Sequence, residues 1–286
     1  MSNILFDLSG KIKEPSHIDA LFAIKKVADS LSIPFFIVGA SARDYIFEHC
    51  YNIKSPRITT DIDLGVEVSD WDQFNKLTTF LISTGKFANT RRKERLLFGN
   101  VSIDIIPFGS IAGEHKRISW PPEQELIMNM LGFQEAYEYS ITVRLNSNPD
   151  LDIKLPTLPG LALMKIISWK EKYPSRQKDA EDLLFIMNKY EDTGNRDRLY
   201  NEEQSLLQEE GFDNKIAGIR LLGRDMAKMA DLDTVKEIKS ILDKETEEQD
   251  NYRLVTDMIM GLRTFREKFD EILNQLIKLK QGFIEI

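Results

Sequence analysis

Thr60-Asp61-Ile62-Asp63-Leu64 is the most informative stretch of this 286-residue sequence. From residue 61 to residue 68, apolar side chains alternate with polar or small ones, and the apolar ones are Ile62, Leu64, Val66 and Val68. Alternation with a period of two is typical of a strand that has one face in the core and the other in solvent. Asp61 and Asp63 therefore share the outward face of this predicted strand.

Two neighbouring carboxylates resist ionising together unless a cation lies between them. Mg²⁺ suits such a pair, because it binds a few carboxylate oxygens together with water and substrate phosphate, and Mn²⁺ takes the same kind of ligand. We therefore predict that Asp61 and Asp63 are ligands of Mg²⁺ or Mn²⁺. An Asp-x-Asp pair is also ordinary on the solvent side of a strand, so the prediction depends on what surrounds it.

A third carboxylate, Asp104, belongs to a second predicted strand over residues 101–108. This strand follows one over residues 95–98, and Gly99-Asn100 between them indicates a tight hairpin. Its residues 101, 103 and 105 are apolar, so Asp104 points to the opposite face. If this strand lies beside the first, three carboxylates converge on one side of a sheet. Two metal ions held there could activate an attacking oxygen and stabilise a leaving pyrophosphate.

The predicted elements divide the chain into a mixed first half and a helical second half. Helices are predicted over 15–31, 40–50 and 71–81, and further strands over 35–38, 140–145 and 151–154. After Pro159 the patterns are helical, at 159–169 and at roughly 176–190, 213–229, 233–245 and 249–280. We expect an α+β protein: a mixed sheet with flanking helices over 1–155, then an all-helical domain over 156–286 that completes the cleft.

Composition excludes several classes of protein. With 42% apolar and 29% charged residues the chain is globular, and its net charge of −8 excludes an overall basic nucleic-acid coat but allows a local basic patch. No apolar run approaches the roughly 18 residues that span a bilayer, and the N-terminus lacks a secretory pattern. With one cysteine, Cys50, the chain forms no internal disulfide, which favours a reducing, cytoplasmic setting. The absence of a long apolar run predicts that there is no membrane partner.

Three stretches together resemble the nucleotidyltransferase fold, and more closely the AbiEii toxin-type bacterial nucleotidyltransferases. They are Ile37-Val38-Gly39-Ala40-Ser41-Ala42-Arg43-Asp44, Arg57 to Leu64, and Ser102-Ile103-Asp104. The resemblance implies that Asp61 and Asp63 bind catalytic metal and that Asp104 completes the site. It also implies that Gly39, Ala40, Ser41 and Arg43 meet the nucleotide, with Ala40 standing where the superfamily usually has Gly or Ser. A glycine turn before a helix N-terminus suits an anion, because the backbone can approach it closely.

A supporting motif lies in the helical half. Leu163-Met164-Lys165-Ile166 and Lys178-Asp179-Ala180-Glu181-Asp182-Leu183 resemble a helix with an inward Lys and a following acidic helix start in AbiEii-like proteins. The resemblance implies that Lys165 touches the triphosphate and that Asp179 and Asp182 orient it or the catalytic groups. We expect Lys165 to be partly wet, so that its removal leaves the fold intact. Acidic residues in a first helical turn are equally explained by the helix dipole.

Arg91, Arg92, Lys93 and Arg95 form a basic cluster in this acidic chain. The cluster could bind an RNA or tRNA acceptor through its phosphates, although such clusters are usually solvated surface.

The leading hypothesis is a metal-dependent nucleotidyltransferase that moves NMP from an NTP such as ATP to a hydroxyl of RNA, tRNA or protein. By resemblance alone it is a toxin paired with an antitoxin. The alternatives are a non-catalytic nucleotide- or nucleic-acid-binding module on the same fold, and a small-molecule transferase of the antibiotic-modifying type. A small-molecule transferase of that type needs an acidic pocket for its cationic acceptor, whereas the basic cluster favours an anionic acceptor.

Overall fold

The computed structural model describes residues 4–57, 59–122, 126–247, 251–260 and 265–286, without the side chains of 265–267. Ile58, within one of the quoted motifs, lies outside these ranges. The chain divides into two compact units, Met1–Thr157 and Leu158–Ile286. None of the helices in the described ranges has the length and apolar character needed to cross a bilayer.

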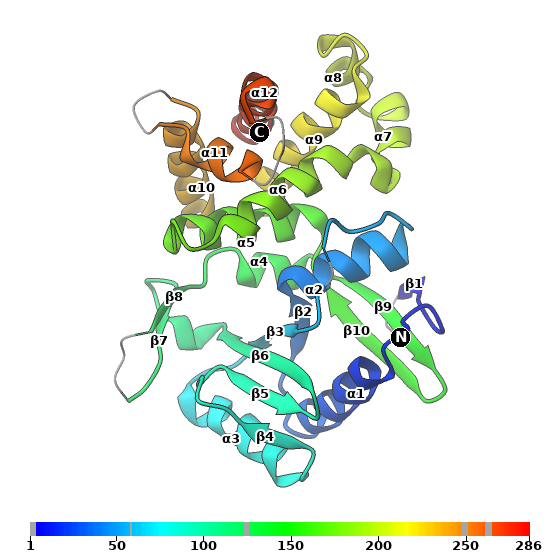
Figure 1. Ribbon diagram of the computed structural model, residues 1–286, viewed down its shortest axis with the longest axis vertical. Helices are drawn as coiled ribbons and strands as arrows, with labels where there is room; N and C mark the ends of the chain where they lie inside the picture. Colours follow the sequence, from blue (N-terminus) through cyan, green and yellow to red (C-terminus); the bar gives the residue numbers. More distant parts are fainter. Residues whose placement is uncertain (1–3, 58, 123–125, 248–250, 261–264) are drawn as a thin grey trace. The chain divides into compact units, whose positions relative to one another are not determined.

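A five-stranded mixed sheet forms the centre of the first unit, with strand order β2-β3-β6-β5-β4 (Figure 1). Its strands are β2 (Phe35–Val38), β3 (Ile62–Glu67), β6 (Val101–Phe108), β5 (Arg95–Phe98) and β4 (Phe87–Asn89). The pair β3–β6 is parallel and the other three pairs are antiparallel. A parallel pair needs a crossover, and α3 (Trp71–Ser83) with β4 and β5 supplies it.

Two helices cover one face of this sheet. Pro15 begins α1 (Pro15–Ser30), whose inner face buries residues such as Leu21 and Ile24. Helix α3 starts where the carboxylate of Asp70 accepts the N–H of Gln73 at 2.8 Å, a typical N-cap. The two helices pack on each other, with α1 also against β6 and α3 against β4. The opposite face of the sheet carries the predicted site, and the turn after β2 lies over it.

The remaining elements of the first unit are smaller. A second sheet has the order β1-β9-β10, formed by β1 (Ile4–Asp7), β9 (Ile141–Ser147) and β10 (Asp150–Leu155). A two-stranded ribbon joins β7 (Arg117–Ser119) to β8 (Ile127–Asn129). The helical segments are α2 (Gly39–Asp44), the π-helical η1 (Tyr45–Cys50), the 3₁₀ turn η2 (Ser110–Ala112) and α4 (Phe133–Glu138).

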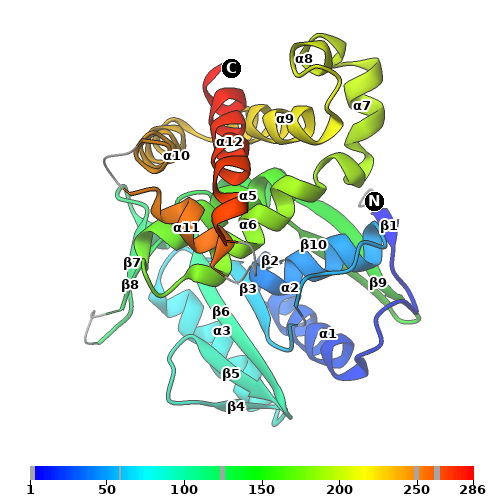
Figure 2. The same ribbon diagram turned by 45° about the horizontal axis from the view of Figure 1, so that its top comes forward.

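The described part of the second unit is helical throughout (Figure 2). It contains α5 (Leu158–Glu171), α6 (Gln177–Lys189), η3 (Glu191–Asn195), α7 (Arg196–Asn201), α8 (Gln204–Glu209), α9 (Asn214–Met229), α10 (Leu232–Glu245), α11 (Arg253–Ile259) and α12 (Phe265–Ile284). Helix α5 is buried on almost every side, and α9 packs along α12. The amphipathic faces of these helices therefore enclose a core of their own.

The predicted α+β class, with a mixed sheet followed by a helical region, is confirmed. Two element predictions are corrected. The helix predicted over 40–50 is α2 followed by a π-helical turn. The single helix predicted over 249–280 corresponds, among the described residues, to two helices that pack against each other, α11 ending at Ile259 and α12. Residues 249–250 and 261–264 of that prediction lie outside the described ranges. Periodicity misses such divisions, because both helices bury an apolar face and the pattern continues across the break.

Candidate active site

Asp63 and Asp104 are direct partners on the parallel strands β3 and β6. On the next strand Arg95 is the partner of Asp104, so the three side chains form one row across the sheet. The neighbouring row, on the opposite face, consists of Ile62, Ile103 and Leu96, all buried. Side chains paired on neighbouring strands are close enough to interact directly. The sheet therefore sets two carboxylates and a guanidinium side by side on its outward face.

Gly39 closes over this row. Strand β2 ends at Val38, which pairs with Asp63, and the chain turns away at Gly39 with φ +67°. A Cβ at this position would lie 2.8 Å from Cγ of Asp63 and would collide with its Oδ2. Any other residue would also be strained at this φ. Glycine therefore leaves the space that the Asp63 carboxylate occupies.

Ser41 and Ala40 complete the turn. The buried Ser41 hydroxyl donates to the Val38 carbonyl at 3.0 Å and accepts the Asp63 N–H at 3.3 Å. Ala40, between Gly39 and Ser41 in the turn, is half-buried. Ser41, predicted to meet the nucleotide, thus joins the turn to β3 through its hydroxyl and fixes the backbone of Asp63.

Arg43 is also internal rather than exposed toward a ligand. Its side chain is fully buried and donates to Asp44 Oδ1 at 2.6 and 2.9 Å. One of its nitrogens also donates to the Arg57 carbonyl at 3.0 Å and to the Thr59 hydroxyl at 3.4 Å. Arg43 therefore ties α2 to the segment that leads into Asp61.

Arg95 binds two of the three predicted metal ligands. Its Nε lies 2.6 Å from Asp104 Oδ1, and one terminal nitrogen lies 2.8 Å from Asp104 Oδ2 and 3.1 Å from Asp61 Oδ2. Asp104 is 13% exposed and Asp61 40% exposed, so this ion pair is only partly screened by water. The hydrogen bond to Asp104 raises the pKa of Arg95 above its ordinary value. The guanidinium thus neutralises the outer part of the carboxylate group.

The four cations of the predicted acceptor cluster have different surroundings. Arg92 pairs with Glu94 at 2.6 Å and comes within 3.9 Å of Asp104. Lys93 donates to the Pro121 carbonyl at 2.7 Å, while Arg91 is exposed. Arg95 faces the carboxylates as described above. The segment therefore connects the carboxylate row to a neighbouring surface, and its role toward an acceptor stays a prediction.

The donor set suits a hard divalent cation, although the present arrangement is not a closed metal cage. Within the described ranges no group of three or more His, Cys, Asp or Glu side chains is close enough to hold an ion. The side chains of Asp63 and Asp104 are nevertheless in register, and the missing Cβ of Gly39 leaves the space that the Asp63 carboxylate itself occupies. Carboxylate oxygens with room for water and phosphate are what Mg²⁺ and Mn²⁺ bind. The residues present fit the predicted metal.

Lys165 lies in a buried charge cluster of the second unit. Its amine is 2.7 Å from Asp179 Oδ1 and 2.7 Å from Asp182 Oδ2, and Ser168 donates to the other oxygen of Asp179 at 2.9 Å. Lys165 is 6% exposed, so the expectation that it is partly wet is wrong. Burial acts to lower the pKa of Lys165, but the two negative charges outweigh it and keep the pKa above its usual value.

Sequence reasoning missed two of these contacts. The pairing of Arg95 with Asp104 follows from counting outward from the Gly99-Asn100 turn, since each residue before it pairs with one after it. The burial of Lys165 also has a signal, because four neighbouring positions on its helix are Leu161, Leu163, Ile166 and Ile167. Ser168, one turn after Lys165, has no comparable signal.

Comparison with known proteins identifies the family. The family model described as "Nucleotidyl transferase AbiEii toxin, Type IV TA system" matches residues 47–275. No match was found among curated proteins. Among solved structures, the antibiotic-resistance factor ANT(2'')-Ia is 12% identical, with a TM-score of 0.36 over 69% of this chain and 97% of that one.

A second group of similar structures consists of CCA-adding enzymes. One in complex with ATP is 13% identical, with a TM-score of 0.32 over 95% of this chain and 80% of that one. The Thermotoga maritima enzyme with tRNA is 13% identical, with a TM-score of 0.26 over 96% and 80%. The family model, which covers most of the chain, carries the assignment. The chain belongs to the AbiEii nucleotidyltransferase family, and it is a nucleotidyltransferase.

Proposed function

We propose that this AbiEii-family nucleotidyltransferase moves a nucleoside monophosphate from an NTP to a hydroxyl group of RNA, using Mg²⁺ or Mn²⁺. The observation that carries the proposal is the in-register pair Asp63 and Asp104 beneath the Gly39 turn. A nucleotidyltransferase needs carboxylates at one point of a rigid scaffold, next to backbone that phosphate can approach. A pair of adjacent strands is such a scaffold.

Asp61, Asp63 and Asp104 would hold the metal, which when bound supplies charge neutralisation for the triphosphate and activation of the attacking oxygen. In the reaction, an acceptor hydroxyl oxygen forms a bond to the α-phosphorus, and the bond from that phosphorus to the bridging oxygen breaks. Pyrophosphate leaves with the negative charge of that oxygen, and the hydroxyl proton is lost to a base. Asp104 is the proposed base, because beside Asp63 it would ligate the metal next to the attacking oxygen.

Several side chains would act by positioning these groups. Ser41 fixes the backbone of Asp63, and Arg43 fixes the segment before Asp61. Arg95 holds both oxygens of Asp104, which sets the plane of that carboxylate. The bidentate geometry of a guanidinium makes this hold directional. The turn at Gly39 and Ala40 would contribute backbone groups to the phosphates, whose binding is mainly a matter of position and charge.

The buried contacts of Lys165 support a role other than direct phosphate binding. Its amine is already bonded to Asp179 and Asp182, and neither carboxylate is exposed. We therefore assign Lys165 the task of holding these two acidic side chains, and with them the relation of α5 to α6. Asp179 and Asp182 would in turn fix the start of α6, which the family resemblance places near the nucleotide.

The acceptor and the biological role are the finer parts of the proposal. Arg91, Arg92 and Lys93 are exposed and lie within a few residues of Arg95 in the carboxylate row, which supports an anionic acceptor such as RNA or tRNA. The family description supports a toxin that is countered by an antitoxin. Expression of the active protein alone would then slow the growth of a host cell, and Asp63→Asn would abolish this effect.

The experiment is transfer from each of the four α-labelled NTPs, with Mg²⁺ or Mn²⁺, onto total RNA and onto the protein itself. We expect labelled RNA with the wild-type protein, and a loss of label with Asp63→Asn or Asp104→Asn. Glu67→Gln is the matched control, since Glu67 lies on the same strand and the same face as Asp63. Equal transfer by Asp63→Asn and the wild type would refute the metal site, and label on protein alone would refute the RNA acceptor.

A non-catalytic binding module is the competing hypothesis, and the same samples distinguish it. Calorimetry would then give Mg²⁺–NTP binding that depends on Asp63 without transfer to any acceptor.

A further inference from the structure

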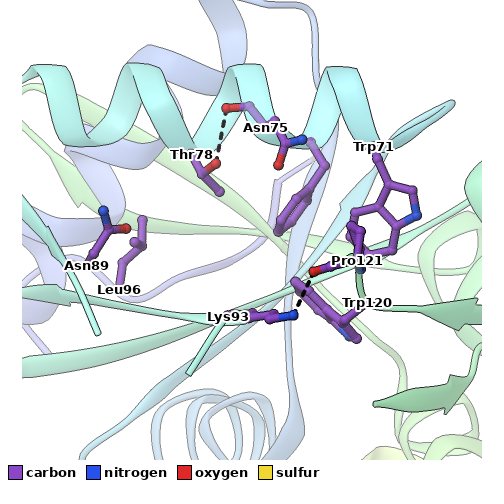
Figure 3. A pocket seen from close by; sticks show the side chains of 9 residues that line it. Trp71, Asn75, Thr78, Asn89, Lys93, Leu96, Trp120 and Pro121 are labelled. Atoms are coloured by element: carbon purple, nitrogen blue, oxygen red, sulfur yellow. Dashed lines mark hydrogen bonds between the residues drawn. The ribbon is translucent and has the colours of Figure 1, made fainter. Parts of the chain in front are cut away.

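A cavity of ≈ 300 Å³ lies on the face of the sheet opposite to the carboxylate row (Figure 3). It is bounded by α3, by the edge strand β4 and its neighbour β5, and by the segment around Trp120 and Pro121. Leu96 lines it, whereas Arg95, the preceding residue, faces the carboxylates. Because consecutive strand residues point to opposite faces, the two sites lie back to back at the same point of β5.

The wall of this cavity is aromatic. The rings of Trp71 and Trp120 are 5.1 Å apart, and those of Phe74 and Trp120 are 5.3 Å apart and nearly perpendicular. Trp120 is buried, while Trp71 at the start of α3 is half-buried. Trp71 therefore presents part of an indole to the cavity and is held by two further rings. Such a held ring offers a flat surface on which a second planar group can stack.

The rim of the cavity is polar and carries no negative charge among its described lining residues. Asn75 on α3 and Asn89 on β4 are exposed there, and neither amide is hydrogen-bonded to another residue in the described ranges. The amine of Lys93 lies at the same rim, on the Pro121 carbonyl. An amide offers both donors and an acceptor, which is the complement of a nucleobase edge.

The segment before β5 connects this cavity to the carboxylate row. Lys93 lines the cavity, and Arg95, two residues later, binds Asp104 and Asp61. Arg92, the residue before Lys93, comes within 3.9 Å of Asp104. A strand of phosphates that follows these cations would pass from one face of the sheet to the other around the start of β5. A flexible single strand can make this turn, whereas a stiff duplex cannot.

We propose that this cavity binds an unpaired base of single-stranded RNA, stacked on Trp71, with its edge on Asn75 or Asn89 and its phosphate near Lys93. The inference rests on the proposed function, because it specifies which part of the RNA acceptor the enzyme grips outside the reacting end. The volume is at the lower end of small-ligand sites, which suits one base rather than a folded element. Stacking of a base on an aromatic side chain tolerates any base, so the site selects for strandedness more than for sequence.

The test is fluorescence anisotropy of labelled oligo(A) and oligo(U), as single strands and as the annealed duplex, with the full-length protein and without NTP. The wild type should bind the single strands more tightly than the duplex. Trp71→Leu should weaken binding of the single strands by about tenfold or more, the scale of one lost stacking contact. Asn89→Asp, at an exposed position, should also weaken binding, by adding a charge that repels phosphate. Asn201→Asp, an exposed change in the second unit, is the control and should leave the affinity unchanged.

The outcomes separate this inference from the proposed function. Circular dichroism and the melting temperature first establish that each variant is folded, and Asn89→Asp keeps the test decisive if Trp71→Leu is unstable. Unchanged RNA affinity in a folded variant, or equal binding of duplex and single strand, overturns the cavity assignment alone. Transfer that survives Asp63→Asn overturns the proposed function, whatever the cavity variants do. Labelling of a protein acceptor in place of RNA overturns both the acceptor and the cavity assignment.

Discussion

Replacement of Lys165 by Met tests the buried charge cluster of the helical unit. Met has a similar length and no charge, so the change removes the cation and leaves Asp179 and Asp182 facing each other in the core. Asp179 is 5% exposed and Asp182 is 0% exposed, so water cannot replace the lost partner. Removing one side of a buried ion pair costs about 3–5 kcal/mol of unfolding free energy. The total unfolding free energy of a typical domain is roughly 5–15 kcal/mol, so this loss is a large part of it.

The assay is scanning calorimetry at pH 7 and pH 9. At roughly 2–4 °C per kcal/mol, the melting temperature of Lys165→Met should fall by about 6–20 °C. The pKa of Lys165 is raised in the folded state, so its stabilising charge is present below the unfolded-state pKa and is lost only as the pH rises through the higher folded-state pKa. The wild type should therefore keep this contribution at both pH values.

Two further variants make the test of Lys165 decisive. Lys25→Met removes the cation of an exposed i,i+4 pair with Asp29 and should cost at most about 0.5 kcal/mol. Adding Asp179→Leu and Asp182→Leu to Lys165→Met should recover much of the loss, because apolar side chains of similar size need no counter-charge. A fall no larger than that of Lys25→Met would refute the reasoning, since it would mean that the cluster is hydrated.

Three other outcomes are expected. Gly39 and Gly85 both have positive φ, so Gly39→Ala and Gly85→Ala should each lose roughly 1–2 kcal/mol of unfolding free energy. Only Gly39→Ala should also lose Mg²⁺–NTP binding, because its Cβ displaces Asp63, whereas the space around Gly85 is open. Equal Mg²⁺–NTP binding by both variants contradicts this. Arg95→Gln should lower the melting temperature in EDTA and regain more of it with added Mg²⁺ than the wild type does, since the carboxylates lose their internal counter-ion; an identical Mg²⁺ response would count against that role. Burial raises the pKa of the Cys50 thiol to about 12, so iodoacetamide at pH 8 should label it slowly in the native protein and rapidly in urea, as mass spectrometry can measure.

Local patterns were sufficient for the elements that carry the site. The alternation over 61–68 predicts β3 and the outward direction of Asp63, because a strand has only two faces. The Gly99-Asn100 hairpin predicts β5 and β6, although the pairing of Arg95 with Asp104 that the same turn implies was not predicted. These inferences succeed because the interacting residues are close in the chain, so the geometry of one strand or one turn relates them.

The tertiary structure decided the contacts between segments that are distant in sequence. Periodicity places Asp63 and Asp104 each on a face, but only the parallel pairing of β3 with β6, across the α3 crossover, makes them neighbours. In the same way, the close approach of Gly39 to Asp63 depends on the pairing of β2 with β3. Lys165 is amid apolar residues in the sequence, yet its counter-charges come from the next helix. Such contacts depend on packing and register between elements, which no local period of apolar residues records.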